Sequence, residues 1–264
     1  MPTYDTATKH RLLLQWLILV GVMTFVLFVV WHQGLIELLL GYDRSRISLA
    51  ILIIFALASG HAAVQVYHLS NELDAGGAIV NLLRSMPDAK LRLADDGTAT
   101  LDDRPLPVCL LTQHICHALQ QYRARPPAPE AAGEQSMLLS ALEKRVKGRH
   151  SIGWLIADLM FKLGLLGTVI GFILMLGAVT DISDFDVGTM QVMLRDMSGG
   201  MRVALFTTLS GLIGGILLGM QYHLVDRGAD ELLATITEVS EVYVMPRILS
   251  AGSGEQASGT GSDA

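Results

Sequence analysis

The stretch of residues 163–179 constrains the fold of this chain more than any other part of the sequence. It reads LGLLGTVIGFILMLGAV and is apolar enough to lie in a lipid bilayer, yet small or polar residues recur along it. Their i, i+3, i+4, i+7 spacing places them on a single face of an α-helix. These residues are Gly164, Gly167, Thr168 and Gly171. Small residues let helix backbones approach closely in lipid, so this stretch predicts a membrane helix that packs against another helix.

A second apolar stretch, residues 203–224, carries the matching feature. Small residues and hydroxyls again crowd one side of the helix that it predicts. They are Ala204, Thr207, Thr208, Gly211, Gly215 and Gly219. The two stretches together predict a packed helix pair with threonine hydroxyls on the packing side, within a polytopic membrane protein.

The composition agrees with a membrane protein. The chain has 264 residues, of which 51% are hydrophobic and only 17% are charged, so it is too apolar for an ordinary soluble domain. A formal net charge of −6 argues against nucleic acid as a partner, because no basic stripe is present to neutralise phosphates.

Two further apolar stretches, residues 12–31 and 47–67, are each long enough to cross a hydrocarbon core of roughly 30 Å. Trp16 and Trp31 lie near the two ends of the first, as interfacial aromatic residues often do. A cleaved signal peptide is the alternative, but the apolar run is too long and no small-x-small cleavage site follows it. We therefore expect a retained N-terminal membrane hairpin over residues 1–67.

The second of these spans contains His61 and Gln65, one helical turn apart. An ionisable residue at membrane depth suggests a proton relay. The alternative is a histidine that is hydrogen-bonded near the cytoplasmic interface, close to the end of the span.

Residues 68–150 are charged and contain prolines, which predicts a small cytoplasmic domain. An amphipathic helix with a Gly-Gly interruption comes first, and alternating residues around Asp96-Gly97 then predict a short β-hairpin, with a solvated loop as the alternative. A helix over residues 108–124 and a proline-rich break follow.

Four residues of metal-ligating types gather in this segment, but their spacing fits no familiar zinc pattern, and neighbouring helical positions point about 100° apart. They are Cys109, His114, Cys116 and His117. We expect no metal site and no cofactor, and two cysteines are too few for a disulfide framework.

The second helix pair occupies residues 151–246, with membrane spans at 153–179 and 203–224. Asp158 and Lys162 are spaced i, i+4 at the cytoplasmic interface, where they can form an ion pair. The loop between the spans should hold a short helical piece and a break at Gly199-Gly200. The fourth helix should continue into the cytoplasm as far as Pro246, and residues 247–264 should form a disordered tail.

The basic residues set the expected orientation. Four of them adjoin the third span and favour the cytoplasmic side: Lys144, Arg145, Lys147 and Arg149. The sequence therefore predicts an all-α membrane protein with four transmembrane helices and both termini in the cytoplasm. Two of its helices should be long and extend into the cytoplasm.

The segments LGLLGTVIGF and GMRVALFTTLSGL closely resemble the MotA/TolQ/ExbB proton-channel family, and the resemblance covers about residues 154–246. Two spans before the cytoplasmic segment make the layout similar to MotA. The resemblance implies a homopentamer in the bacterial inner membrane that encloses a dimer of a single-span protein similar to MotB, TolR or ExbD. The resemblance also implies that an aspartate of that partner carries the proton, and that ion flow is converted into mechanical work such as motility or protein transport.

Thr168 and Thr208 match the pore threonines of the family, with Thr207 beside them. Val203 stands where ExbB and TolQ have a glutamate, so no proton role follows from that position. Neither channel stretch contains Asp, Glu, Lys or Arg, and hydroxyls do not titrate usefully at neutral pH, so the carboxylate must come from another chain.

Two other interpretations are compatible with the same sequence features. The threonines can serve only as interhelical hydrogen-bond donors, and the chain can be a non-conducting oligomeric scaffold for a secretion or envelope complex. An enzyme is not expected, because no nucleophile–base pair or metal cluster is evident.

Overall fold

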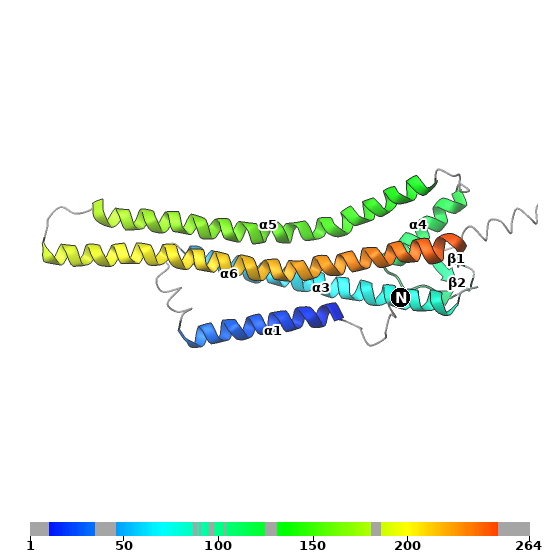
Figure 1. The fold of residues 1–264 in the computed structure, drawn as a ribbon, viewed down its shortest axis with the longest axis horizontal. Helices are drawn as coiled ribbons and strands as arrows, with labels where there is room; N and C mark the ends of the chain where they lie inside the picture. The colour runs from blue at the N-terminus through cyan, green and yellow to red at the C-terminus, as the bar shows by residue number, and fades with distance from the viewer. Residues whose placement is uncertain are drawn as a thin grey trace, which may run out of the picture. The chain divides into compact units, whose positions relative to one another are not determined.

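The computed structural model describes residues 11–34, 46–86, 89, 91–94, 98–102, 104–124, 131–180 and 186–247. Four of its helices are long and apolar enough to cross a membrane: α1 (Arg11–His32), α3 (Ile47–Ser85), α5 (Ala131–Thr180) and α6 (Val187–Val239). A short helix α4 (Leu110–Ala124), three short strands and the π-helix η2 (Ser240–Val244) complete the described elements. Figure 1 shows the helices coloured in chain order. The expected all-α fold with four spanning helices and a small hairpin is thus confirmed.

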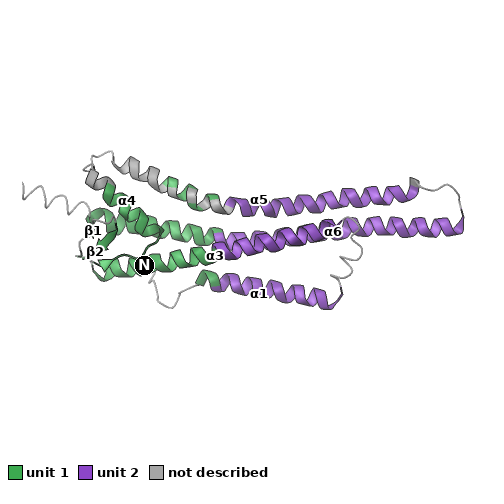
Figure 2. Cartoon of the chain, turned by 180° about the vertical axis from the view of Figure 1, so that it is seen from behind, with its two compact units in different colours: residues 1–13, 66–148, 226–264 green, residues 14–65, 149–225 purple. Residues whose placement is uncertain are grey.

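The chain divides into two compact units, coloured in Figure 2. Unit 1 comprises residues 1–13, 66–148 and 226–264, and unit 2 comprises residues 14–65 and 149–225. All four long helices contribute residues to both units, and the threonines and glycines of the two small-residue faces lie in unit 2.

Unit 1 contains the sheet, in which β1 (Leu91–Leu93) pairs antiparallel with β2 (Ala99–Leu101). The register places Leu91 opposite Leu101, as the alternating sequence predicts, although the turn at Asp96-Gly97 lies outside the described residues. A third strand, β3 (Arg104–Pro105), was not expected. Asp102 turns the chain into it with a φ of 46°, a left-handed conformation that aspartate tolerates better than most residues.

Side-chain-to-backbone hydrogen bonds fix the helix ends of unit 1. A Glu72 carboxylate oxygen accepts from the backbone N–H of Leu110 at 2.8 Å and so caps the N-terminus of α4. Arg247 donates to the carbonyls of Leu83 (2.9 Å) and Met86 (2.8 Å) at the end of α3. These two contacts tie α4 and the chain after α6 to the same helix.

His114 of α4 is buried in unit 1, with its Nε2 3.4 Å from the Ser240 hydroxyl. Burial, and secondarily the neighbouring His117, lower the pKa of His114 from its ordinary value, because both disfavour the charged imidazolium. Ser240 begins the π-helix η2 (Ser240–Val244), which continues directly from α6. Within the described residues, no three His, Cys, Asp or Glu side chains are grouped so as to hold a metal ion.

Several expected helix boundaries were wrong, two of them because glycine does not break a helix that is held by its neighbours. The α3 helix runs unbroken through Gly76 and Gly77, and α6 begins at Val187 and runs unbroken through Gly199 and Gly200. The α5 helix begins 20 residues before the expected start at 151. Helix also continues to Arg247, past Pro246. Of the predicted proline-rich break at 125–134, residues 131–134 belong to α5 instead, and residues 125–130 lie outside the described residues, as does the tail from 248 onward.

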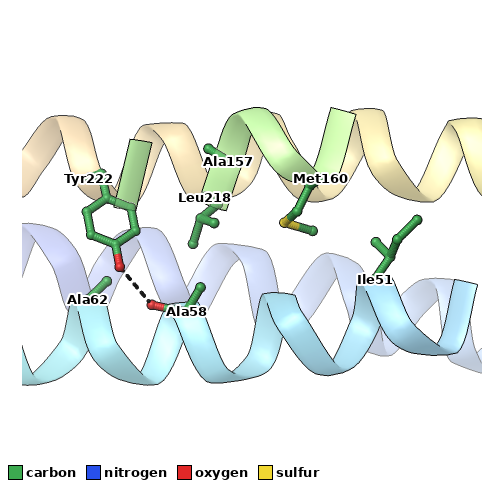
Figure 3. Close-up of a cluster of buried hydrophobic side chains, with 7 residues drawn as sticks. All are labelled: Ile51, Ala58, Ala62, Ala157, Met160, Leu218 and Tyr222. Carbon is green, nitrogen blue, oxygen red and sulfur yellow. Dashed lines mark hydrogen bonds between the residues drawn. The ribbon is translucent and has the colours of Figure 1, made fainter. Parts of the chain in front are cut away.

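The core of unit 2 is a cluster in which three helices meet, shown in Figure 3. Its members are Ile51, Ala58 and Ala62 of α3, Ala157 and Met160 of α5, and Leu218 and Tyr222 of α6. Alanines on α3 and α5 leave room for the larger side chains of the opposite helix, so the three helices can pack without a cavity-sized mismatch.

Candidate functional site

The candidate site is the contact between α5 and α6 in unit 2. Its first component is Gly164, on which a Cβ atom would lie 3.2 Å from the Cα of Gly211 and 3.4 Å from the Cα of Thr208. A Cβ on Gly211 would lie 2.6 Å from the carbonyl oxygen of Met160. The neighbours are backbone atoms that cannot turn aside, so glycine at these positions lets the two backbones touch.

The contact continues one and two helical turns along α5. A Cβ on Gly167 would lie 2.2 Å from the hydroxyl oxygen of Thr207, and one on Gly171 would lie 2.6 Å from the backbone nitrogen of Ala204. A Cβ on Gly200 would lie 2.6 Å from the backbone nitrogen of Met175. We call this set of residues, 164–175 of α5 with 200–211 of α6, the glycine contact.

Gly200 was missed in the sequence because it falls in the segment that was expected to be a loop. The signal was present, since Gly200, Ala204, Thr208 and Gly211 continue one small-residue face at i, i+4, i+8 and i+11. At Gly215 the three atoms nearest to an added Cβ would all belong to the Phe161 ring, the closest at 2.7 Å. The glycine contact therefore ends at Gly211, and an aromatic side chain fills the next turn.

The three threonines occupy different positions around this contact. Thr207 is 0% exposed, and its hydroxyl donates to the carbonyls of Val203 (2.9 Å) and Ala204 (3.1 Å) on its own helix. The Thr207 side chain points at Gly167 and fills the space that a side chain at position 167 would occupy. Thr207 is thus a packing residue within the subunit.

Thr208 and Thr168 are only half-buried. The Thr208 hydroxyl lies 3.0 Å from the carbonyl of Ala204 and 3.2 Å from that of Gly164, so it bridges α6 and α5. The Thr168 hydroxyl donates to the carbonyl of Leu165 at 2.5 Å. A hydroxyl that gives its proton to the backbone keeps lone pairs that can accept a hydrogen bond from elsewhere.

The two charged candidates lie away from these threonines along α5. Lys162 and Asp158 form an ion pair of 2.5 Å, and both side chains are well exposed, at 69% and 55%. An exposed i, i+4 pair contributes only about 0.3–0.5 kcal/mol, so this pair fits a structural role at the surface of the helix.

The comparison with protein families gave one match, over residues 114–238, to the MotA/TolQ/ExbB proton channel family. The comparisons with curated proteins and with solved structures gave no match. The matched residues include the whole glycine contact and all three threonines. The family consists of stator-type channel subunits rather than enzymes, typical of the inner membrane, and four candidate spans make this chain multi-pass. This chain therefore carries a domain of the MotA/TolQ/ExbB proton channel family.

Proposed function

We propose that this chain is the ring-forming subunit of an ion-driven membrane motor, in which Thr168 and Thr208 line the proton path. The observation that carries the proposal is the difference between the adjacent threonines 207 and 208. Thr207 is fully buried inside the subunit, whereas Thr208 bridges two helices and remains accessible. A partner helix that lies along this edge would meet the hydroxyls of Thr208 and Thr168.

The proton carrier in this proposal belongs to the partner. Residues 163–179 and 203–224 contain no Asp, Glu, Lys or Arg, so these two stretches hold no carboxylate of their own. The hydroxyls of Thr168 and Thr208 would accept a hydrogen bond from a protonated aspartic acid, or from water, as the partner changes its protonation state. A dimer of a single-span protein similar to MotB, TolR or ExbD fits this requirement.

A homopentamer is the assembly that we propose around such a partner. The small-residue faces of α5 and α6 pack against each other within one subunit, so neighbouring subunits of the ring must be joined through another surface. Both helices carry long rows of exposed apolar side chains, among them Leu165, Phe172, Leu205, Leu212 and Ile216. These rows supply apolar area for lipid and for neighbouring subunits.

The test of the path replaces threonine by valine, which keeps the shape and removes the hydroxyl. The complex is purified from its native membranes, reconstituted into liposomes with a pH-sensitive dye, and assayed for proton flux. We expect Thr168→Val and Thr208→Val each to lower the flux about tenfold or more, equivalent to about 1.4 kcal/mol. Assembly, measured by native mass spectrometry, should be unchanged.

Thr207→Val is the matched control, because its hydroxyl bonds only to its own helix and valine fills the same space. Its flux should stay within about twofold of the parent protein. Full flux in the Thr168→Val, Thr208→Val double variant would refute the path. An assembled complex that conducts no protons, even with all threonines present, would instead favour the non-conducting scaffold.

We also propose that both termini lie in the cytoplasm, on the basis of the basic residues near the third span. With Cys109 and Cys116 replaced by serine, Gly188→Cys at the start of α6 should react with an impermeant thiol reagent in intact cells. Val108→Cys, which is 87% exposed in unit 1, should not react until the cells are opened. The reverse labelling pattern would overturn this orientation.

A further inference from the structure

One turn of α5, from Gly164 to Thr168, holds the hydroxyls of both threonines in the proposed path. The Thr168 hydroxyl donates to the carbonyl of Leu165 at 2.5 Å, and the Thr208 hydroxyl lies 3.2 Å from the carbonyl of Gly164. These carbonyls belong to consecutive residues, which are separated by about 1.5 Å along the helix axis. The two hydroxyls are therefore held at the same turn of α5, although they come from different helices.

The two threonines differ in what holds them. Thr168 bonds to its own helix, so its hydroxyl does not depend on how α6 packs. Thr208 has one acceptor on its own helix, the carbonyl of Ala204 at 3.0 Å, and a second on α5, that of Gly164. A threonine in a helix divides between two χ1 rotamers, because its hydroxyl can bond the preceding turn. The acceptor on α5 favours the rotamer whose hydroxyl faces it, so the direction of the Thr208 hydroxyl depends on Gly164.

Gly164 brings its carbonyl within reach of Thr208 because it has no side chain. A Cβ at position 164 would lie 3.2 Å from the Gly211 Cα, 3.3 Å from the Thr207 carbonyl oxygen and 3.4 Å from the Thr208 Cα. All three are backbone atoms, so the helices can approach this closely only with glycine at this position. The closest approach of the two backbones thus lies directly beside Thr208.

We propose that Gly164 is a positioning residue of the proton path. Its contact with the α6 backbone and its carbonyl hold the Thr208 hydroxyl at the level of Thr168. This inference rests on the proposed function, since it assigns Gly164 to the path that uses these threonines. Gly171 has a different part in the glycine contact, because the two atoms nearest to a Cβ there would belong to Ala204.

The Gly164→Ala variant separates positioning from packing. Contacts of 3.2–3.4 Å are slightly too short for a Cβ, so the neighbouring backbone must give way by a few tenths of an ångström. Such a shift lengthens the 3.2 Å contact between Thr208 and the Gly164 carbonyl towards about 3.6 Å, at which no hydrogen bond remains. The bonds from Thr208 to Ala204 and from Thr168 to Leu165 lie within single helices and are kept.

The test measures proton flux through the complex, purified from its native membranes and reconstituted into liposomes. Loss of one interhelical hydrogen bond should lower the flux of Gly164→Ala about threefold or more, equivalent to about 0.6 kcal/mol, with assembly unchanged. In the Thr208→Val background the same change should lower the flux by less than about 1.5-fold, because no hydroxyl is left to position. Gly177→Ala is the matched control on α5, since a Cβ there would meet no atom within 4 Å, and its flux should equal that of the parent.

Solid-state NMR of the complete protein in lipid, labelled with ¹³C in threonine, supplies a second readout. The Thr208 Cβ signal of the parent is identified by its absence in Thr208→Val. In Gly164→Ala this signal should shift or divide between two rotamers, whereas the Thr168 signal should stay where it is, because its acceptor is on its own helix. An unchanged Thr208 signal would contradict the inference.

Thr208→Ser tests the same point without changing the glycine, in case Gly164→Ala does not assemble. Serine keeps the hydroxyl and both acceptors, so its flux should stay within about twofold of the parent. Flux as low as that of Thr208→Val would overturn the inference, as would equal losses from Gly164→Ala with and without the Thr208 hydroxyl. Full flux in Gly164→Ala, where Thr208→Val is impaired, would overturn the inference and leave the path intact. Full flux in Thr208→Val would instead refute a path through Thr208, and the inference with it.

Discussion

The α6 helix is held on two sides of unit 2 in opposite ways. Against α5, glycines at positions such as 164 and 211 bring backbone against backbone. Against α3, the contact depends on side chains, of which Tyr222 is the largest that is fully buried. The contact with α5 depends on the absence of side chains at its glycines, whereas the contact with α3 depends on the Tyr222 side chain. The two contacts should therefore respond differently to the same kind of substitution.

The largest expected effect comes from Tyr222→Ala. The tyrosine ring covers Gly153, where a Cβ would lie 2.0 Å from the ring, and its hydroxyl reaches α3. Removing the ring leaves a cavity where three helices meet, which should lower the free energy of unfolding by about 3–5 kcal/mol. Denaturation in mixed micelles, followed by circular dichroism, measures the change.

Tyr222→Phe separates the ring from its hydroxyl and serves as the control. It should cost only about 0.5–1.5 kcal/mol, because the packing stays and the hydrogen bonds are lost. If Tyr222→Ala cost no more than Tyr222→Phe, the contact with α3 would depend on hydrogen bonds rather than on the ring, and the contrast between the two sides of α6 would fail.

The next effect in size tests the glycine contact. In Gly211→Ala the added methyl group would lie 2.6 Å from the Met160 carbonyl and 2.8 Å from the Gly164 Cα, so the helices must separate. Overpacking of this kind should lower the free energy of unfolding by about 1–3 kcal/mol, in the same micelle assay.

Gly199→Ala is the matched change on the same helix, because a Cβ there would meet no atom within 4 Å. Alanine favours a helix over glycine, so this variant should be as stable as the parent or more stable by about 0.5–1 kcal/mol. Equal losses in both variants would show that glycine at position 211 serves the helix itself and not the contact.

The glycine contact could be predicted from the sequence because helical spacing alone decides which residues share a face. Gly164, Gly167 and Gly171 were expected to share one packing face, and a Cβ atom added to any of the three would meet atoms of α6. Helical spacing alone could not predict that Thr207 would be fully buried while Thr208 stayed accessible, since both positions lie near the edge of that face. This difference depends on how α5 is rotated, which only the packed structure shows.

The other side of α6 was less predictable. His61 and Gln65 were recognised as a polar pair, but their partner Tyr222 lies 161 residues from His61 in sequence. No local pattern links the two positions. The same holds in unit 1 for the cap that Glu72 provides to α4, across 38 residues. Contacts between single side chains far apart in sequence depend on the tertiary arrangement and leave no periodic signal.

The smallest expected effect concerns Gln221, which is buried beside Tyr222. Its oxygen accepts from Ser59, whereas its amide nitrogen lies 3.6 Å from the Met23 sulfur, and a thioether is a weak acceptor. Gln221→Met keeps the length of the side chain and removes the imperfectly satisfied amide. Ser59 can then donate to a carbonyl one turn back on α3, as serines in helices commonly do. Interhelical hydrogen bonds in membranes average about 0.6 kcal/mol, so we expect the free energy of unfolding to change by less than about 1 kcal/mol.

A double-mutant cycle that combines Gln221→Met with Ser59→Ala isolates the hydrogen bond between these two side chains, and its coupling energy should be of the same size. A coupling above about 2 kcal/mol would show that polar bonds, rather than the tyrosine ring, hold α3 against α6.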